Sequence, residues 1–279
     1  MTLRQALHET GQNLRSAGVE GADSIARLLL EEAGSFTYAA LVASMDAPLN
    51  DGCLRSYRAM AERAARGEPV QYVLGHWDFY GRRFQTDARA LIPRSETELL
   101  VEAALAAMPA GRALRVMDAG AGTGCIGITV KLERPCSRVT LCDVSADALA
   151  LVRENAALLG AEIELLLADM RMPFPGAPYD VIISNPPYID AVDMARLSPN
   201  VADYEPRLAL YGGEDGLDLI RALASRAIDS LRDAGRMFVE IGYNQADAAA
   251  AIFREAGIQA AVRPDYAGIP RILAARKGY

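Results

Sequence analysis

An asparagine followed by two prolines and a tyrosine, Asn185-Pro186-Pro187-Tyr188, is the part of the sequence that most directly suggests chemistry. The Asn185 side-chain oxygen and the Pro186 carbonyl are hydrogen-bond acceptors, and proline has no backbone N–H of its own. Such acceptors suit a planar –NH2 group, and the Tyr188 ring offers a face on which that group can stack. We predict Asn185, Pro186 and Tyr188 as catalytic residues, and all four residues as substrate-binding.

The nitrogen of such a planar group is a poor nucleophile because its lone pair is delocalised. Two acceptors that attract both of its hydrogens favour a pyramidal nitrogen with a lone pair aimed at an electrophile. Most of the rate acceleration would then come from positioning and electrostatics, and no side chain stands out as a general base. The alternative interpretation of the motif is a Pro-Pro turn that only ends a strand.

A second segment, Gly120-Ala121-Gly122-Thr123-Gly124, follows an apolar strand pattern and precedes a helical one. Glycines let the backbone turn tightly and approach a ligand closely. Asp143 ends the next strand about 20 residues later, where its carboxylate can accept hydrogen bonds from ribose hydroxyls. This pattern alone fits a nicotinamide cofactor as well as S-adenosylmethionine.

The residues around the glycines favour S-adenosylmethionine. Asp118, two residues before the first glycine, is typical of methyltransferases, as are Asp169 after the third strand and the asparagine–proline motif after the fourth. We expect Asp118 to orient the loop or attract the cationic methionine end of the cofactor, and Asp169 to accept from the adenine amino group. The predicted cofactor-binding residues are Asp118, Gly120, Ala121, Gly122, Thr123, Gly124, Asp143, Asp169, Met170 and Asn185.

Both motifs require a scaffold that brings the ends of several strands together. From residue 95 onward, short apolar segments alternate with helical patterns, which implies a doubly wound, Rossmann-like parallel sheet. The last two strands have too short a link for a parallel crossover and should pair antiparallel. Seven strands are expected at 115–118, 138–143, 163–167, 179–184, 236–241, 259–263 and 271–275, and helices at 98–108, 126–132, 146–159, 217–231 and 245–256.

The first 75 residues contain no catalytic constellation and predict a small helical domain. Asp23 and Thr37 are candidate N-caps for helices over 24–32 and 38–45, and another helix is expected from Asp51. Residues 76–94 form a connector with a hairpin whose turn we place at Gly81-Arg82. We therefore expect a helical domain over 1–75, a connector over 76–94 and a catalytic domain over 95–279.

Composition limits the kind of partner. The 279 residues carry a net charge of −7 without a groove-sized basic stripe, so no direct contact with nucleic acid is expected. The four cysteines contain no Cys-x-x-Cys pair, and with only two histidines a metal site is not expected. No apolar run is long enough for a membrane span, and no signal peptide is recognised, so we expect a cytoplasmic protein.

The chain resembles the glutamine amide methyltransferases that modify peptide chain release factors. The resemblance covers nearly the whole chain. It implies that S-adenosylmethionine is used to methylate the glutamine of the release factor's Gly-Gly-Gln motif, and that the N-terminal helical domain docks the release factor. The resembling segments are 68–72, Gly75, 79–84, 91–98, the glycine loop, 184–189, 204–210, 212–216 and 239–242.

The sequence departs from this family at Ser95, where proline is usual, and in the glycine loop, where Ala119 and Ala121 replace other residues. Small replacements leave the backbone role of the loop intact. Ser95 is shared with a related methyltransferase that acts on a glutamine of a ribosomal protein, so that substrate is the main alternative. An adenine-specific nucleic-acid methyltransferase would share both motifs but needs a basic groove. A small-molecule methyltransferase would usually have an insertion over its pocket.

Overall fold

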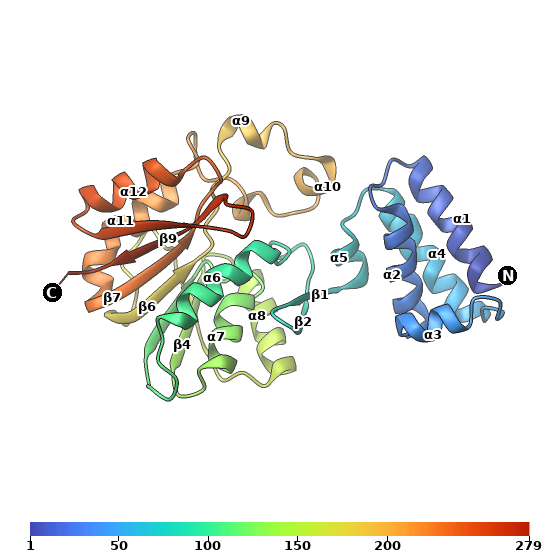
Figure 1. The fold of residues 1–279 in the computed structure, drawn as a ribbon, viewed down its shortest axis with the longest axis horizontal. Coiled ribbons are helices and arrows are strands. Elements are labelled where there is room, and N and C mark those ends of the chain that lie inside the picture. Colours follow the sequence, from blue (N-terminus) through green and yellow to red (C-terminus); the bar gives the residue numbers. More distant parts are fainter. Residues whose placement is uncertain (279) are drawn as a thin grey trace. The chain divides into compact units, whose positions relative to one another are not determined.

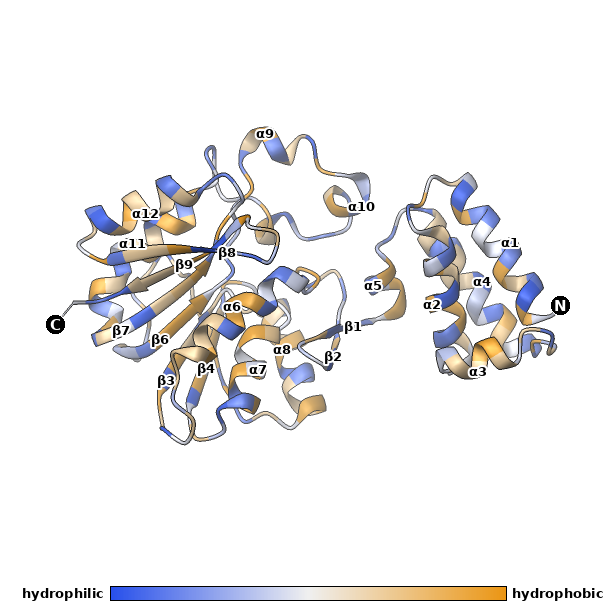
Figure 2. Cartoon of the chain, viewed as in Figure 1, coloured by the Kyte–Doolittle hydropathy of each residue, from blue (hydrophilic) through white to orange (hydrophobic). Residues whose placement is uncertain are grey.

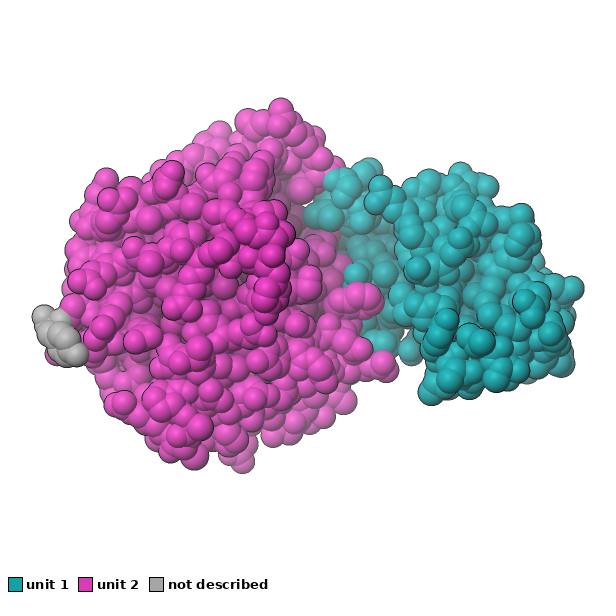
Figure 3. All heavy atoms as spheres, viewed as in Figure 1, with its two compact units in different colours: residues 1–76, 198–204 teal, residues 77–197, 205–279 magenta. Residues whose placement is uncertain are grey.

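A computed structural model describes residues 1–278 of the chain. The chain divides into two compact units, shown in different colours in Figure 3. One unit contains residues 1–76 together with residues 198–204, and the other contains residues 77–197 and those from 205 onward. In the described residues no helix is both long enough and apolar enough to cross a membrane.

The helical unit is built from α1 (Leu3–Ser16), α2 (Ala22–Gly34), α3 (Tyr38–Ala43), α4 (Asp51–Ala65) and α5 (Val70–Leu74), and the segment 198–204 adds the short helix α10 (Pro199–Ala202). Thr37 caps α3 as expected, because its side chain accepts from the backbone N–H of Ala40 at 3.2 Å. The prediction that Asp23 caps α2 is wrong. Gly21 precedes this helix in a left-handed conformation (φ 66°), so the helix begins at Ala22 and the Asp23 carboxylate pairs with Arg15.

Apolar side chains from α1 to α5 form the core of the helical unit, with Leu14, Leu29, Leu30 and Leu41 fully buried. Tyr57 of α4 is also fully buried, and its hydroxyl donates to the carbonyl of Ala26 at 3.1 Å. This bond satisfies the one polar atom of a large buried ring.

The hairpin consists of β1 (His76–Phe79) and β2 (Arg82–Gln85), and its turn lies one residue earlier than we predicted. Tyr80 and Gly81 both have positive φ angles, 50° and 69°, which is the backbone of a two-residue type I′ turn. Phe79 and Phe84 are buried in the core of the sheet-containing unit, with ring centroids 6.1 Å apart.

The sheet-containing unit is a seven-stranded sheet in the order β5-β4-β3-β6-β7-β9-β8 (Figure 1). The five strands from β5 to β7 run parallel, and β9 is antiparallel to both neighbours, as the short link predicted. The expected doubly wound fold is confirmed. The strands are β3 (Arg115–Ala119), β4 (Arg138–Asp143), β5 (Glu164–Leu167), β6 (Tyr179–Ser184), β7 (Leu231–Glu240), β8 (Gln259–Pro264) and β9 (Pro270–Arg276).

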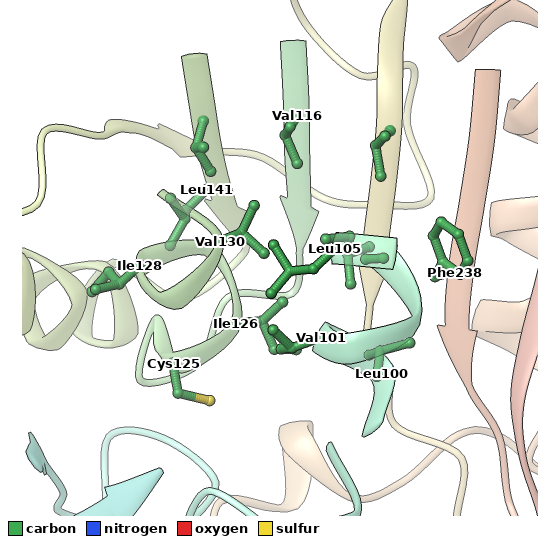
Figure 4. Packing of buried hydrophobic residues seen from close by; sticks show 14 of the residues in the cluster. Leu100, Val101, Leu105, Val116, Cys125, Ile126, Ile128, Val130, Leu141 and Phe238 are labelled. Atoms are coloured by element: carbon green, nitrogen blue, oxygen red, sulfur yellow. The ribbon is translucent and has the colours of Figure 1, made fainter. Parts of the chain in front are cut away.

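Two apolar clusters lie on opposite faces of this sheet, because successive residues of a strand point to opposite sides. Val116 belongs to one cluster and Met117 to the other. Helices α6 (Ser95–Ala106), α7 (Cys125–Glu133) and α8 (Ala146–Leu159) cover the first face, and Figure 4 shows α6 and α7 side chains against the strands. Helices α11 (Asp218–Ser230) and α12 (Ala246–Glu255) cover the second. The strong hydrophobic colour of the central strands in Figure 2 reflects this burial on both faces.

Several element boundaries differ from the predicted ones. Helix α6 begins at Ser95 rather than at residue 98, and β7 begins at Leu231, five residues before the expected start. The strand starts early because Leu231 already pairs with Tyr179, before a register shift that separates it from the regular part of the ladder. The short helices α9 (Ala191–Met194) and α10 and a 3₁₀ turn at Arg207–Ala209 were not predicted, since each is too short for a periodic pattern.

Candidate active site

A cavity of about 590 Å³ opens at the carboxyl ends of the parallel strands. Its position is the point where the chain order reverses: β3 has β4 on one side and β6 on the other. Open α/β sheets bind ligands at such a point, and the volume is within the usual range for small-molecule sites. From the predicted site, the cavity is lined by Gly120, Ala121, Gly122, Thr123, Asp143, Asp169, Met170, Asn185 and Pro187.

The glycine loop joins β3 to α7 and is shaped by close contacts. Gly120 has φ 82°, a backbone conformation that favours glycine, and a Cβ atom there would also lie 2.7 Å from the flexible end of the Met170 side chain. The backbone N–H of Gly122 donates to Oδ2 of Asp143 at 3.0 Å, and that of Ser145 donates to Oδ1 at 2.9 Å. Backbone donors on both sides therefore hold the Asp143 carboxylate at the wall of the cavity.

Asp118 lies beneath the glycine loop and does not line the cavity. Its side chain is fully buried, and Oδ2 accepts from the backbone N–H of Gly127 in the first turn of α7 at 2.8 Å. The other oxygen has no hydrogen-bond partner among the described residues. Burial raises the pKa of Asp118 to about 7, and the charge of Asp143 adds to this effect. The contact with Gly127 ties β3 to α7 and so bears on the shape of the loop between them.

Asp169 follows β5 at the cavity wall, and its carboxylate is engaged by a neighbouring side chain. Arg171 donates from Nη2 to Oδ2 at 2.7 Å and from Nε to Oδ1 at 3.0 Å. These hydrogen bonds lower the pKa of Asp169, so the carboxylate is ionised at neutral pH. We predicted that the Asp169 carboxylate accepts from an adenine amino group. In this structure Arg171 already donates to both oxygens of that carboxylate.

The asparagine–proline motif begins where β6 ends. Ser184 is fully buried, and its hydroxyl donates to the carbonyl of Ala119 at 2.6 Å, which joins the ends of β6 and β3. Nδ2 of Asn185 donates to Oγ1 of Thr97 at 3.1 Å. Because one end of the amide is occupied in this way, its oxygen remains as an acceptor at the cavity. Pro186 is buried and does not itself line the cavity.

Tyr188 is mostly buried and lies outside the cavity lining. Its hydroxyl donates to Oε1 of Glu240 at 3.4 Å, a long hydrogen bond. Burial and the Glu240 carboxylate raise the pKa of Tyr188 well above its ordinary value, so the phenol keeps its proton. The contact fixes the ring edge that carries the hydroxyl.

Residues that the sequence did not single out hold the motif from behind. Gln245 is nearly buried and donates from Nε2 to the carbonyls of Tyr188 at 3.0 Å and Gly216 at 3.1 Å. A Cβ atom on Gly212 would lie 2.7 Å from the Pro187 carbonyl, and one on Gly216 would overlap the Tyr188 carbonyl. Gly212 and Gly216 thus allow their backbone to pack directly against that of Pro187 and Tyr188.

An ion pair between a buried carboxylate and a partly exposed arginine lies beside the cavity. Glu205 is almost completely buried, and its carboxylate accepts from the backbone N–H of Ile92 at 3.3 Å and from Nη2 of Arg94 at 2.5 Å. Ile92 and Arg94 both line the cavity. Glu205 therefore fixes the segment before α6, which supplies part of the wall.

Comparison with known proteins gives two matches to family models. The model described as "Methyltransferase small domain" matches residues 95–199, and that described as "PrmC N-terminal domain" matches residues 5–75. A methyltransferase structure from Pyrococcus furiosus is 16% identical and aligns over 81% of this chain and 98% of its own, with a TM-score of 0.56. This likeness agrees with the sheet architecture predicted from the sequence.

Curated relatives extend the match to nearly the full length. The release factor glutamine methyltransferase of Cereibacter sphaeroides is 42% identical, and that of Koribacter versatilis is 37% identical. Each comparison covers 99% of this chain and 99% of the relative.

Proposed function

Because this chain belongs to the release factor glutamine methyltransferase family, we propose that it uses S-adenosylmethionine to methylate the glutamine of the Gly-Gly-Gln motif in peptide chain release factors. The observation that carries this proposal is the Asn185 amide at the cavity, whose nitrogen is bound to Thr97 and whose oxygen is left as an acceptor. Such an acceptor can bind one hydrogen of a substrate amide –NH2. The expected place of action is the cytoplasm, where translation takes place.

The cavity residues suit S-adenosylmethionine. Asp143 has an immobilised carboxylate for ribose hydroxyls, and the glycine loop and Met170 bring backbone and a flexible apolar side chain to the same wall. When bound, the cofactor supplies an electrophilic methyl group on a positively charged sulfur. Arginines line the cavity as well as aspartates, so the choice of this cofactor rests on the family and on the ribose acceptor rather than on the net charge of the cavity.

The substrate amide is proposed to be held by acceptors. The methylated amide nitrogen would be a strong acid and would pass its extra proton to water, so no side-chain base is required. The Asn185 oxygen at the cavity accepts one amide hydrogen. The Pro186 carbonyl, which lies between the cavity-lining residues Asn185 and Pro187 but does not itself line the cavity, is proposed to accept the other once the substrate is bound. Two such contacts favour a pyramidal nitrogen with an available lone pair. The raised pKa of Tyr188 means that its phenol keeps its proton at neutral pH and is not a base. We therefore assign Tyr188 a supporting role through its ring. Preorganised acceptors of this kind act through positioning and electrostatics.

The deciding experiment presents several possible acceptors together. Purified release factors, ribosomal proteins and DNA are incubated with the enzyme and labelled S-adenosylmethionine, and the products are analysed by mass spectrometry. We expect one methyl group on the glutamine of the release factor's Gly-Gly-Gln motif, and none after that glutamine is replaced. Label on adenine, or on a ribosomal protein in preference to the release factor, would show that the proposed substrate is wrong.

Ser95 no longer gives separate support to the ribosomal-protein alternative. It is the first residue of α6, directly after the N-cap Arg94, and its hydroxyl donates to Glu96. Proline is favoured at this helix position because its fixed φ suits a helix start. A Ser-for-Pro difference there has a local explanation in helix geometry, and Ser95 does not line the cavity.

We also propose that the helical unit docks the release factor. All cavity-lining residues come from position 89 onward, so the helical unit contributes no side chain to the proposed chemistry. A variant that starts near residue 77 keeps the hairpin whose Phe79 and Phe84 pack in the core of the sheet-containing unit, and it should bind the cofactor but lose most activity on intact release factor. Because Tyr204 donates to the Arg66 carbonyl within the helical unit, cofactor affinity and thermal melting are measured first. Full activity of a folded truncation would contradict a docking role.

A further inference from the structure

Glu240 is a buried carboxylate at the end of β7, behind the asparagine–proline motif. Its exposed fraction is 2%, and it does not line the cavity. In the sheet, Ser184 pairs with Val239, so Glu240 comes next to Asn185 at the carboxyl ends of two neighbouring strands. A buried charge of this kind requires hydrogen-bonding partners.

The two partners of Glu240 are both parts of the proposed substrate site. Oγ1 of Thr97 donates to Oε2 at 2.7 Å, and the Tyr188 hydroxyl donates to Oε1 at 3.4 Å. Thr97 in turn accepts from Nδ2 of Asn185 at 3.1 Å. A continuous chain of hydrogen bonds therefore runs from Asn185 through Thr97 to Glu240.

The chemistry of these groups sets the direction of the chain. An ionised carboxylate can only accept, so the single hydroxyl hydrogen of Thr97 must go to Glu240. The Thr97 oxygen is then left as an acceptor toward Asn185, and only the –NH2 end of the Asn185 amide can satisfy it. The amide oxygen must consequently point away from Thr97.

We propose that Glu240 is a positioning residue that, through the hydroxyl of Thr97, fixes the Asn185 amide with its oxygen free to accept the substrate's N–H. This inference rests on the proposed function, because it assigns a role to the orientation of a residue in that site. Glu240 is not a catalytic residue here, since the Thr97 hydroxyl lies between it and Asn185.

Protonation of Glu240 would permit the opposite direction. A neutral carboxyl can donate to Thr97, whose own hydrogen can then go to the Asn185 oxygen and turn the –NH2 group to the cavity. Burial raises the pKa of Glu240 to about 7. The charge of Glu96 on α6 also raises this pKa, whereas the charge of Arg271 on β9 lowers it. Tyr188 after β6 and the Cys125 thiol on α7 remain protonated around it. Turnover should therefore decline as the pH falls below about 7.

The first test compares two replacements of Thr97 at about pH 8.5, where Glu240 is ionised. Thr97→Ser keeps the hydroxyl, and Thr97→Val keeps the shape without it. We expect kcat on intact release factor to fall about 10- to 100-fold in Thr97→Val, the range seen when groups that orient metal ligands are removed, and to stay near wild type in Thr97→Ser. Cofactor affinity should change little in either variant.

Thr129→Val is the matched control. Thr129 is fully buried in α7, and its hydroxyl has no hydrogen-bond partner among the described residues. The same chemical change there should leave kcat unaltered. Equal kcat in Thr97→Val and Thr97→Ser would overturn the proposal.

Glu240→Gln tests the charge itself, because a glutamine can donate to Thr97 as well as accept from it. We expect a lower kcat without the decline below about pH 7, and a KM close to wild type. Wild-type kcat in this variant, or the same acid decline, would remove Glu240 from the role. If the wild-type enzyme fails to label the release factor glutamine, the proposed function fails first, which separates the two results.

Discussion

The two halves of the cavity are held in place by different kinds of groups. On the cofactor side, backbone N–H groups of Gly122, Ser145 and Gly127 bind the carboxylates of Asp143 and Asp118. On the substrate side, the chain of Asn185, Thr97, Glu240 and Tyr188 consists of side chains bound to side chains. Backbone donors thus hold two carboxylates on the cofactor side, although the Arg171 side chain holds Asp169, while the amide orientation on the substrate side depends on four particular side chains.

This difference predicts that single substitutions affect separate kinetic quantities. Changes on the substrate side should lower turnover with little effect on cofactor affinity. Changes on the cofactor side should weaken cofactor affinity while the substrate acceptors keep their arrangement. Substitutions at four positions follow, from the largest expected effect to the smallest. Those at Asn185, Asp143 and Tyr188 test this separation, and that at Asp118 tests the buried carboxyl beneath the glycine loop.

Asn185→Ala should have the largest effect. It removes an acceptor that is preorganised for the amide nitrogen, and loss of one such group lowers kcat by roughly 10²–10³ in other sites. Asn185→Asp keeps an acceptor but cannot donate to Thr97, so we expect partial activity. The measurements are kcat on release factor and calorimetric affinity for S-adenosylmethionine. A similar loss in both variants would show that acceptance is not the essential role.

Asp118→Asn should change how stability depends on pH. The unfolded pKa of 3.8 rises to about 7 on folding, so the favourable contribution of Asp118 is present below about pH 4 and is lost as the pH rises through 7. The free energy of unfolding of the asparagine variant minus that of the wild type should increase by a few kcal/mol between about pH 4 and 7. Denaturant titrations across this range measure the difference. A constant difference would contradict the burial of a protonated carboxyl.

Asp143→Ala should weaken cofactor binding by about 1–3 kcal/mol, because ligand hydroxyls and two backbone N–H groups lose their acceptor. At saturating cofactor, kcat should remain within a few-fold of wild type. Calorimetry gives the affinity and steady-state assays give kcat. A large loss of kcat with unchanged affinity would reverse the division between the two halves.

Tyr188→Phe should have the smallest effect. The ring remains, and the hydroxyl that is lost makes only a long hydrogen bond to Glu240. We expect kcat to fall less than about five-fold, since a net hydrogen bond contributes about 1 kcal/mol. Thermal melting provides the control for folding. A loss as large as that in Asn185→Ala would assign the phenol a direct part in the reaction.

Local patterns in the sequence were sufficient for the sheet and for both motifs. The strands β4 and β6 begin and end at the predicted residues, because apolar runs that are buried on both faces are clear signals. We placed the turn at Tyr80-Gly81 one residue too late, because Tyr80 adopts a positive φ that is unusual for tyrosine.

The partners of the motifs could not be found in this way. Thr97 and Glu240 are 143 residues apart, and Gln245 contacts Tyr188 from beyond the next strand. Their contacts depend on which strands become neighbours in three dimensions. The only sequence signal was that Thr97 and Glu240 lie in segments similar to the release factor enzymes.

The close packing of Gly212 and Gly216 against the proline–tyrosine backbone has a consequence for how this enzyme can diverge. Any side chain at either glycine must push Pro187 or Tyr188 out of place, although neither substitution alters a group that binds a ligand. Among natural variants these glycines should be as invariant as the asparagine itself. Invariance at these positions would reflect the lack of space for a Cβ atom between two backbone segments. Conservation alone would not distinguish this cause from a contact with a ligand.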